Sequence, residues 1–194
     1  MRRAAAGDVP ALAAMLARAF ADDPIARWSC PRDDLRPGVL EGFHGARARQ
    51  LVRDGEVWMS ADGASAALWA DPGHWKTSLR DDLELAASMR DPRLWRRAPL
   101  IGYGLLGLEG HHPPRPPHWY LAVLGTDPAA QGRGLGSVVL APVLEGCDRD
   151  GIDAYLVSSK ERNIDFYARF GFRVTREVRL PRGPRAWLMW RDAR

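Results

Sequence analysis

The sequence predicts a single α/β domain over residues 1–194, with a mixed, mostly antiparallel central sheet that carries helices on both faces. Short runs of aliphatic, aromatic and β-branched residues alternate with longer segments whose apolar residues recur at helical spacing. Asp62-Gly63 separates two of the short runs, as in a β-hairpin. A chain of 194 residues is long enough for one well-packed core and short for two.

The N-terminal half is predicted to supply the first helices and the hairpin. Asp8 is a suitable N-cap for a helix with Pro10 in its first turn, and Asp22-Asp23-Pro24 ends that helix. Residues 28–38 are rich in proline and aspartate and predict a loop. The later helices are expected at 39–52, 78–89 and 92–108, and the hairpin strands at 56–60 and 64–69.

The C-terminal half is predicted to alternate strands with helices. Residues 111–118 read HHPPRPPH, and their four prolines predict an extended connector. Pro142 lies inside a predicted helix, where it removes one backbone hydrogen bond and favours a bend. The strands are expected at 119–124, 154–158, 172–180 and 186–190, and the helices from residue 135 to about 147 and over 163–170.

Composition favours a cytoplasmic globular protein with no nucleic-acid or membrane partner. The chain is 46% hydrophobic and 27% charged, and its net charge of +4 comes from scattered arginines without a nucleic-acid-binding motif. No segment approaches the ~20 apolar residues that span a membrane. Asp8 and Pro10 interrupt a start that otherwise resembles a targeting peptide. The oligomeric state stays open between a monomer and a homodimer.

The sequence predicts neither a metal site nor a disulfide. The three histidines of residues 111–118 lack both helical His-x-x-x-His spacing and a neighbouring carboxylate or thiol. Cys30 and Cys147 are far apart and have no CxxC spacing. Neither cysteine lies in a motif, so we expect no covalent enzyme intermediate.

A glycine-rich loop carries the most informative chemistry. It reads Gln131-Gly132-Arg133-Gly134-Leu135-Gly136 and lies between a predicted strand and a predicted helix. Glycines at the mouth of a helix let its free N–H groups approach an anion, and the helix dipole favours negative charge there. The loop therefore predicts diphosphate binding. It is not a Walker loop, because no Lys-Ser or Lys-Thr follows the glycines, and its glycine spacing differs from GxGxxG.

A second motif follows the next predicted strand and reads Asn163-Ile164-Asp165-Phe166-Tyr167-Ala168-Arg169-Phe170-Gly171-Phe172. The two motifs together resemble the GNAT (Gcn5-related) N-acetyltransferase family, in which a Gln-x-x-Gly-x-Gly loop binds acetyl-coenzyme A (acetyl-CoA) and NxxFYxxxGF follows. The resemblance covers residues 119–190 well. More narrowly, segments such as AFADDP, VWMSADGASAALWA and GPRAWLMWR resemble the puromycin N-acetyltransferase branch. The GNAT resemblance implies a sheet that splays at the strand before the loop. It also implies transfer of an acetyl group from acetyl-CoA to a primary amine.

The resemblance also implies the coenzyme contacts. The backbone N–H of Leu124 would bond the thioester carbonyl and that of Thr126 the pantetheine arm, with Gly125 at a bulge between them. The N–H groups of residues 132–137 would hold the pyrophosphate, and Arg133 would add charge. The expected acetyl-CoA contacts are Leu124, Gly125, Thr126, Gln131, Gly132, Arg133, Gly134, Leu135, Gly136, Ser137, Asn163 and Tyr167.

By the same resemblance, the hydroxyl of Tyr167 protonates the leaving thiolate, and the Leu124 N–H faces the oxygen that becomes negative. An amphipathic-helix tyrosine packed beside Phe166 is the structural alternative for Tyr167. His118 and Glu109 are candidates for the base that takes a proton from the amine. Each also fits a structural or solvated role, and no base is needed if the amine arrives neutral.

The acceptor site is expected between the first two helices and residues 69–108. Asp22 and Asp23 would attract an ammonium group, although a solvated turn also explains them. An aromatic wall would suit a ring-bearing acceptor, such as a small aminonucleoside or an antibiotic-like amine. Its candidates are Trp28, Trp69, Trp75, Trp95 and Tyr103, and Tyr120 is a further candidate contact with the acceptor. Three other functions stay open: an acyl-CoA-binding regulatory module, a protein N-acetyltransferase and a kinase-like nucleotide site.

Overall fold

The computed structural model describes residues 1–76, 83, 86 and 91–194. These residues build a seven-stranded sheet in the order β1-β2-β3-β4-β5-β7-β6. Strands β4 and β5 run parallel, and every other neighbouring pair runs antiparallel. The strands are β1 Arg2–Arg3, β2 Gly55–Met59, β3 Ser65–Ala70, β4 Trp119–Thr126, β5 Ala154–Ser158, β6 Arg173–Arg179 and β7 Arg185–Arg191. The predicted mixed, mostly antiparallel sheet is confirmed.

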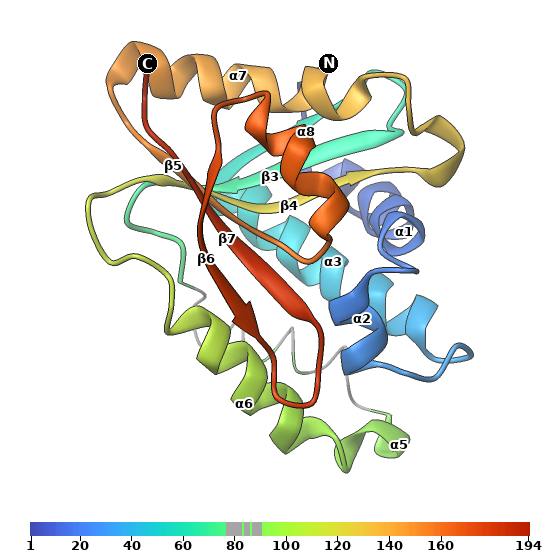
Figure 1. Cartoon of the computed structure of the whole chain (residues 1–194). Coiled ribbons are helices and arrows are strands. Elements are labelled where there is room, and N and C mark those ends of the chain that lie inside the picture. The colour runs from blue at the N-terminus through green and yellow to red at the C-terminus, as the bar shows by residue number, and fades with distance from the viewer. Residues whose placement is uncertain (77–82, 84–85, 87–90) are drawn as a thin grey trace.

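Helices cover both faces of this sheet, as predicted (Figure 1). On one face α1 and α3 pack against Val57, Leu68 and Val123 of the sheet. On the other face α7 packs against Trp69 and Leu156. The helices are α1 Val9–Ala19, α2 Pro24–Ser29, α3 Arg36–Asp54, α5 Pro92–Trp95, α6 Ala98–Glu109, α7 Leu135–Asp150 and α8 Ile164–Ala168, with short 3-10 helices at Ala6–Asp8, Pro128–Ala130 and Glu161–Asn163.

Several boundaries differ from the predicted ones. Asp23 does not only end the first helix, because its carboxylate caps α2 by accepting from the N–H groups of Ile25 and Ala26. The expected loop over 28–38 therefore contains the end of α2 and the start of α3. The expected helix over 92–108 breaks between α5 and α6, and Pro99 opens the second of these. The helix expected over 78–89 lies outside the described residues, apart from positions 83 and 86.

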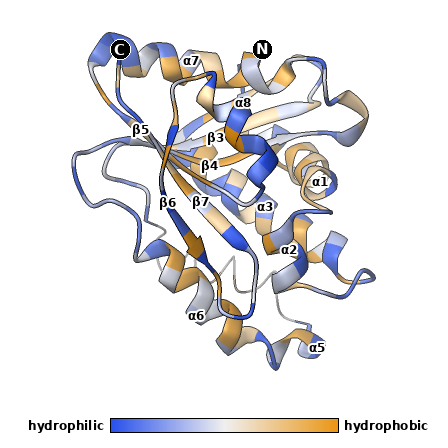
Figure 2. Ribbon diagram, in the orientation of Figure 1, coloured by the Kyte–Doolittle hydropathy of each residue, from blue (hydrophilic) through white to orange (hydrophobic). Residues whose placement is uncertain are grey.

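Asp8 caps the backbone differently from the prediction. It precedes α1, but its carboxylate does not bond that helix; it accepts from the N–H of Ala5 and from the guanidinium of Arg2. Those bonds hold down the short strand β1, which sequence periodicity does not reveal. Strand β6, at the other edge, is rich in hydrophilic residues along its length (Figure 2). Charged side chains on an edge strand discourage pairing with other chains.

The strands at the centre of the sheet separate halfway along. Strands β4 and β5 pair from Trp119 with Ala154 to Leu121 with Leu156. Beyond that point β4 continues to Thr126, while the end of β5 pairs only with β7 in the described part of the chain. The implied splay is therefore present, and it opens a gap in the middle of the sheet.

The bulge that accompanies the splay is not at Gly125. The register of β3 against β4 shifts between Leu68 with Val123 and Trp69 with Leu121, which leaves Ala122 as the extra residue. Gly125 pairs regularly with Ala66. A Cβ at Gly125 would lie 2.5 Å from Cδ2 of Leu16, so glycine there lets α1 pack closely on the sheet.

No helix in the described part of the chain is both long and apolar enough to cross a membrane.

Candidate active site

A cavity of about 570 Å³ fills the gap between β4 and β5. Residues 121–126 of β4 form one wall, and residues 156–158 of β5 form the other. The glycine-rich loop, α8 and the end of α1 complete it. The two motifs that the sequence singles out, residues 131–136 and 163–172, thus meet at one site, although residues 137–162 separate them along the chain.

Backbone N–H groups of β4 point into this gap. The N–H of Asp127 donates to the carbonyl of Ala64 on the β3 side, at 2.8 Å. N–H directions alternate along an antiparallel ladder, and the pairing of residues 123–126 with β3 is regular. The N–H groups of Leu124 and Thr126 therefore face away from β3 and toward the cavity, where a carbonyl oxygen can accept from them.

The glycine-rich loop turns sharply before it enters α7. Gly132 and Gly134 have φ values of 76° and 77°, a left-handed backbone that favours glycine. The loop N–H groups of residues 132–136 have no backbone partner among the described residues. Together with the dipole of α7 they form a cradle for a negatively charged group. Gln131 supports the loop, because its amide donates to the carbonyl of Thr126 at 3.2 Å.

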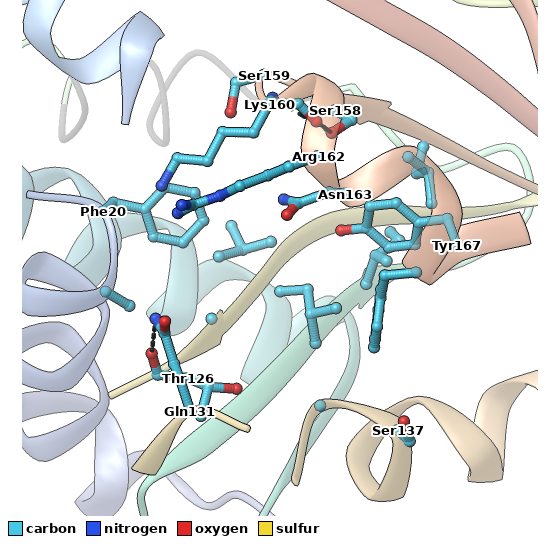
Figure 3. A pocket seen from close by; sticks show the side chains of 18 of the residues that line it. Phe20, Thr126, Gln131, Ser137, Ser158, Ser159, Lys160, Arg162, Asn163 and Tyr167 are labelled. Carbon is cyan, nitrogen blue, oxygen red and sulfur yellow. Dashed lines mark hydrogen bonds between the residues drawn. The ribbon is translucent and has the colours of Figure 1, made fainter. Parts of the chain in front are cut away.

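The cavity wall also carries cations that the motifs do not reveal. Lys160 and Arg162 extend from the loop after β5 into the cavity, toward Phe20 (Figure 3). Arg169 joins them from the end of α8. These side chains suit the phosphates of a coenzyme, whereas Arg133, expected to supply that charge, is exposed and is not among the described lining residues. The sequence offers one signal for these cations, because Lys160 is one of only two lysines in the chain.

Tyr167 is buried at the base of this cavity, where its hydroxyl points inward beside Asn163 (Figure 3). Its ring packs edge-on against Phe166 and Phe172, with ring centroids 5.2 Å and 6.0 Å apart. Burial raises the pKa of Tyr167, and the negative charge of Asp23 raises it further. The phenol therefore stays protonated at neutral pH and is able to donate a proton.

Asp23 reaches the same cavity by an unexpected route. Besides capping α2, its carboxylate accepts a hydrogen bond from the hydroxyl of Ser159, on the loop after β5. The side chain is 4% exposed and lines the cavity together with Phe20. Asp23 thus ties the N-terminal helices to the C-terminal half of the sheet. Asp22, by contrast, is exposed and pairs with Arg27.

A second cavity of about 330 Å³ adjoins the first. Ala122, Val123 and Val157 line both cavities, so the two meet at the gap between β4 and β5. Rings from α3, the loop after β3, β4 and β5 surround the second cavity, including Trp75 and Tyr120. The expected contact Tyr120 and the candidate base Glu109 both lie here.

His118 does not line either cavity in the described part of the chain. It is buried, and its Nε2 lies 3.0 Å from Nε2 of His112, which does line the second cavity. Its Nδ1 lies 2.7 Å from the carbonyl oxygen of Pro116. The proline-rich connector thus directs two histidines inward, which its composition does not indicate.

Four of the expected aromatic acceptor contacts are absent from the described lining of both cavities. Trp28 is buried between α2, α6 and the turn after β6, where its Nε1 donates to the carbonyl of Pro181 at 3.1 Å. Tyr103 is 72% exposed on the outer side of α6. Of the further tryptophans, Trp69 is fully buried in the core and Trp95 is exposed.

The described residues contain no group of three His, Cys, Asp or Glu side chains arranged to hold a metal ion. Cys30 and Cys147 are both buried, with 1% and 0% exposure. Burial raises the pKa of Cys147 to about 12 and also raises the pKa of Cys30. A buried thiol with a raised pKa is a poor nucleophile.

Comparison with known proteins shows similarity to acetyltransferases. Residues 65–172 match the model of the acetyltransferase (GNAT) family. An uncharacterized N-acetyltransferase of Schizosaccharomyces pombe is 28% identical, with 93% of this chain and 77% of the relative covered. A mycothiol acetyltransferase of Kineococcus radiotolerans is 30% identical, with 92% and 61% covered.

Among solved structures, a Corynebacterium glutamicum protein described as histone acetyltransferase HPA2 and related acetyltransferase superposes with a TM-score of 0.67. It is 24% identical, and the match covers 100% of this chain and 95% of that one. At this level of identity the likeness concerns the fold.

Proposed function

This chain belongs to the GNAT family of acyl-CoA-dependent acetyltransferases, and we propose that it transfers the acetyl group of acetyl-CoA to a primary amine by direct attack in a ternary complex. The observation that carries the proposal is the gap beyond Leu121 and Leu156. It opens the first cavity to the N–H groups of β4 and joins that cavity to the second. Two substrates can therefore meet there from different directions.

The first cavity suits acetyl-CoA. The N–H groups of residues 132–136 would hold the pyrophosphate, whereas the N–H of Ser137 donates to the carbonyl of Gly134. Lys160 and Arg162 would pair with phosphate oxygens. Thr126, through its N–H, and Asn163, through its amide, would bond the pantetheine arm along the gap. Bound acetyl-CoA supplies an activated acyl group, and the protein supplies its orientation.

Leu124 is proposed to provide electrostatic stabilisation. Its N–H faces the gap, where the thioester carbonyl would lie. Negative charge develops on that oxygen as the amine attacks, and a fixed backbone donor costs no reorganisation at that moment. Loss of one such donor in a protease costs about 3 kcal/mol of transition-state stabilisation.

Tyr167 is proposed as the general acid. As the bond from carbon to sulfur breaks, its hydroxyl would give a proton to the departing thiolate. The raised pKa keeps that proton in place until it is needed. The buried cysteines take no part, so the acetyl group would pass to the amine without an acyl-enzyme. A neutral amine needs no protein base for its attack. Its nitrogen bonds to the acyl carbon, and the proton that this nitrogen then loses would pass through solvent to the Tyr167 phenolate and restore the phenol.

The acceptor class is tested by thiol release from acetyl-CoA in the presence of different amines. We expect release with at least one small amine among puromycin, 2-phenylethylamine, putrescine and an aminoglycoside. Puromycin is included because of the resemblance to the branch that acetylates it. Release only with a peptide N-terminus would indicate a protein N-acetyltransferase instead. Calorimetric binding of acetyl-CoA without release in any arm would contradict the proposed transfer and favour a binding module.

A further inference from the structure

The second cavity contains a polar group without a partner. The side chain of Tyr155 is 1% exposed, and its hydroxyl has no hydrogen-bond partner among the described residues. A buried hydroxyl left unpaired destabilises a protein, so its retention needs an explanation. Tyr155 lines the second cavity and lies on the same face of β5 as Val157, where the two cavities meet. Its hydroxyl is thus available to a ligand in that cavity.

The two connector histidines determine which nitrogen of His112 can accept a hydrogen bond. The carbonyl of Pro116 can only accept, so Nδ1 of His118 carries the proton. Burial lowers the pKa of His118, which keeps its ring neutral and leaves Nε2 as an acceptor. Nε2 of His112 must then donate across the 3.0 Å contact. This leaves Nδ1 of His112 unprotonated, because burial lowers the pKa of that ring as well, to about 3.

Aromatic rings surround these two polar atoms. The ring of His112 stacks on Trp75 at 3.7 Å and meets Tyr120 and Tyr155 edge-on at 4.9 Å and 4.7 Å. Phe43 adds a further ring from α3. Aromatic ligands bind well in such surroundings because offset and edge-to-face contacts are both offered.

The charges at the second cavity select among amines. Among the described lining residues, Glu109 is the one carboxylate, and Lys76 lies at the same cavity. Glu109 can balance one positive charge on a ligand, whereas the ammonium group of Lys76 would repel a second one. The volume of the second cavity, about 330 Å³, is near the lower end for small-molecule sites. The cavity therefore suits a small monoamine better than a polyamine.

Building on the acetyl transfer proposed above, we propose that the second cavity binds the acceptor as a small aromatic monoamine. Its amino group donates hydrogen bonds to Nδ1 of His112 and to the hydroxyl oxygen of Tyr155, and its ring packs against Trp75 and Tyr120. His118 is a positioning residue, because it fixes the proton on Nε2 of His112. The amine then lies at the junction of the cavities, beside the acyl group held along β4.

The probe is 2-phenylethylamine, compared with 2-cyclohexylethylamine of the same chain length and with putrescine. At saturating acetyl-CoA we expect kcat/KM to be about tenfold higher for the aromatic amine than for either comparison amine, which corresponds to about 1.4 kcal/mol. Equal values for the aromatic and cyclohexyl amines, or a preference for putrescine, would overturn the proposal.

Two substitutions test the hydrogen bonds. Tyr155→Phe removes the hydroxyl and His112→Phe removes both ring nitrogens, while each variant keeps an aromatic ring in place. We expect KM for 2-phenylethylamine to rise about threefold to tenfold with little change in kcat. Tyr103→Phe, which removes an exposed hydroxyl on α6, is the matched control. His112→Asn places an amide oxygen near the position of Nδ1 and should restore part of the affinity. An unchanged KM in both phenylalanine variants would overturn the proposal.

The positioning role of His118 has a spectroscopic test. ¹⁵N spectra of imidazole distinguish protonated from unprotonated ring nitrogens, and we expect Nδ1 of His112 to be unprotonated and to shift when 2-phenylethylamine is added. His118→Gln offers an oxygen near the position of Nε2 and should keep that signature, whereas His118→Leu should lose it. A protonated Nδ1 in the wild-type protein would contradict the assignment.

Calorimetry separates failure of this inference from failure of the proposed function. Binding of 2-phenylethylamine to the protein with coenzyme A present does not depend on turnover. Binding that weakens in Tyr155→Phe, without thiol release, would refute acetyl transfer and support the amine site. Thiol release with other amines, without any binding of 2-phenylethylamine, would support transfer and overturn the amine site.

Discussion

Asp23 and Tyr167 lie on the wall of one cavity, and the carboxylate adds to the effect of burial in raising the pKa of the phenol. Asp23 is held there by the N–H groups at the start of α2 and by the hydroxyl of Ser159. A residue from the N-terminal helices thus influences the residue proposed to protonate the leaving group. The two motifs of the C-terminal half do not complete the site alone.

Replacement of Tyr167 by phenylalanine tests the general acid. The variant keeps the ring contacts with Phe166 and Phe172 and loses only the hydroxyl. General acid catalysis contributes about 10²-fold to 10⁴-fold, so we expect kcat to fall by at least ~10²-fold. The dissociation constant of acetyl-CoA, measured by calorimetry, should change little. Unchanged turnover would show that the hydroxyl has a structural role.

Replacement of Gly136 by alanine separates coenzyme binding from stability. Gly136 is the second residue of α7, and an added Cβ would meet Phe166 at 3.5 Å and Oγ1 of Thr126 at 3.8 Å, both ordinary contacts. Alanine favours helix over glycine by up to about 1 kcal/mol, so urea unfolding should show equal or greater stability. The methyl group would crowd the pyrophosphate cradle, and we expect the dissociation constant of acetyl-CoA to rise.

The control for that variant is Gly102→Ala. Gly102 lies inside α6, and an added Cβ there has no atom within 4 Å among the described residues. It should raise stability by a similar amount and leave acetyl-CoA binding unchanged. A loss of affinity in both variants, or in neither, would contradict the assignment of Gly136 to the cradle.

Local sequence patterns predicted the parts of this fold that depend on local interactions. The glycine-rich loop, the hairpin at Asp62 and the strand 154–158 were found because turn residues and alternation act over a few positions. The proposed coenzyme side of the site depends on the two motifs, whose residues line one cavity. The sequence analysis misses the short helix α2 because it takes Asp22-Asp23-Pro24 as the end of the first helix, although Asp-Pro also begins helices.

The proposed acceptor side could not be predicted in the same way. It depends on contacts between elements far apart in sequence, such as the stack of Trp75 on His112. Residues 111–118 looked like a surface connector, and nothing in their composition indicates that two histidines are buried and bonded to each other. Trp28 and Tyr103 have the composition expected of an aromatic pocket, but packing places one in the core and the other in solvent.

Thiol modification tests the absence of an acyl-enzyme. Both cysteines are buried and burial raises both pKa values, so the folded protein should react slowly with N-ethylmaleimide. We expect acetyl transfer to continue at its full rate after such treatment. Mass spectrometry should find two modified cysteines only after unfolding. Rapid inactivation that acetyl-CoA prevents would point to a thiol in the site.

The stability of the fold should depend on pH through His44. This residue of α3 is 3% exposed and packs between Phe20 at 4.8 Å and Phe43 at 5.3 Å. Neither ring nitrogen has a hydrogen-bond partner among the described residues, and burial lowers the pKa from 6.5 to about 4. Between these values the unfolded chain binds a proton that the folded chain does not.

Stability should therefore fall as pH decreases from about 7 toward 4, by about 2 kcal/mol at pH 5 from this residue alone. His44→Leu removes the group, so the difference in unfolding free energy between pH 7 and pH 5, measured with urea, should shrink by about that amount. His74→Leu, at an exposed position, is the matched control and should keep the wild-type dependence. If His44→Leu loses as much stability on acidification as the wild type does, then His44 is protonated equally in both states, and its burial does not determine its charge.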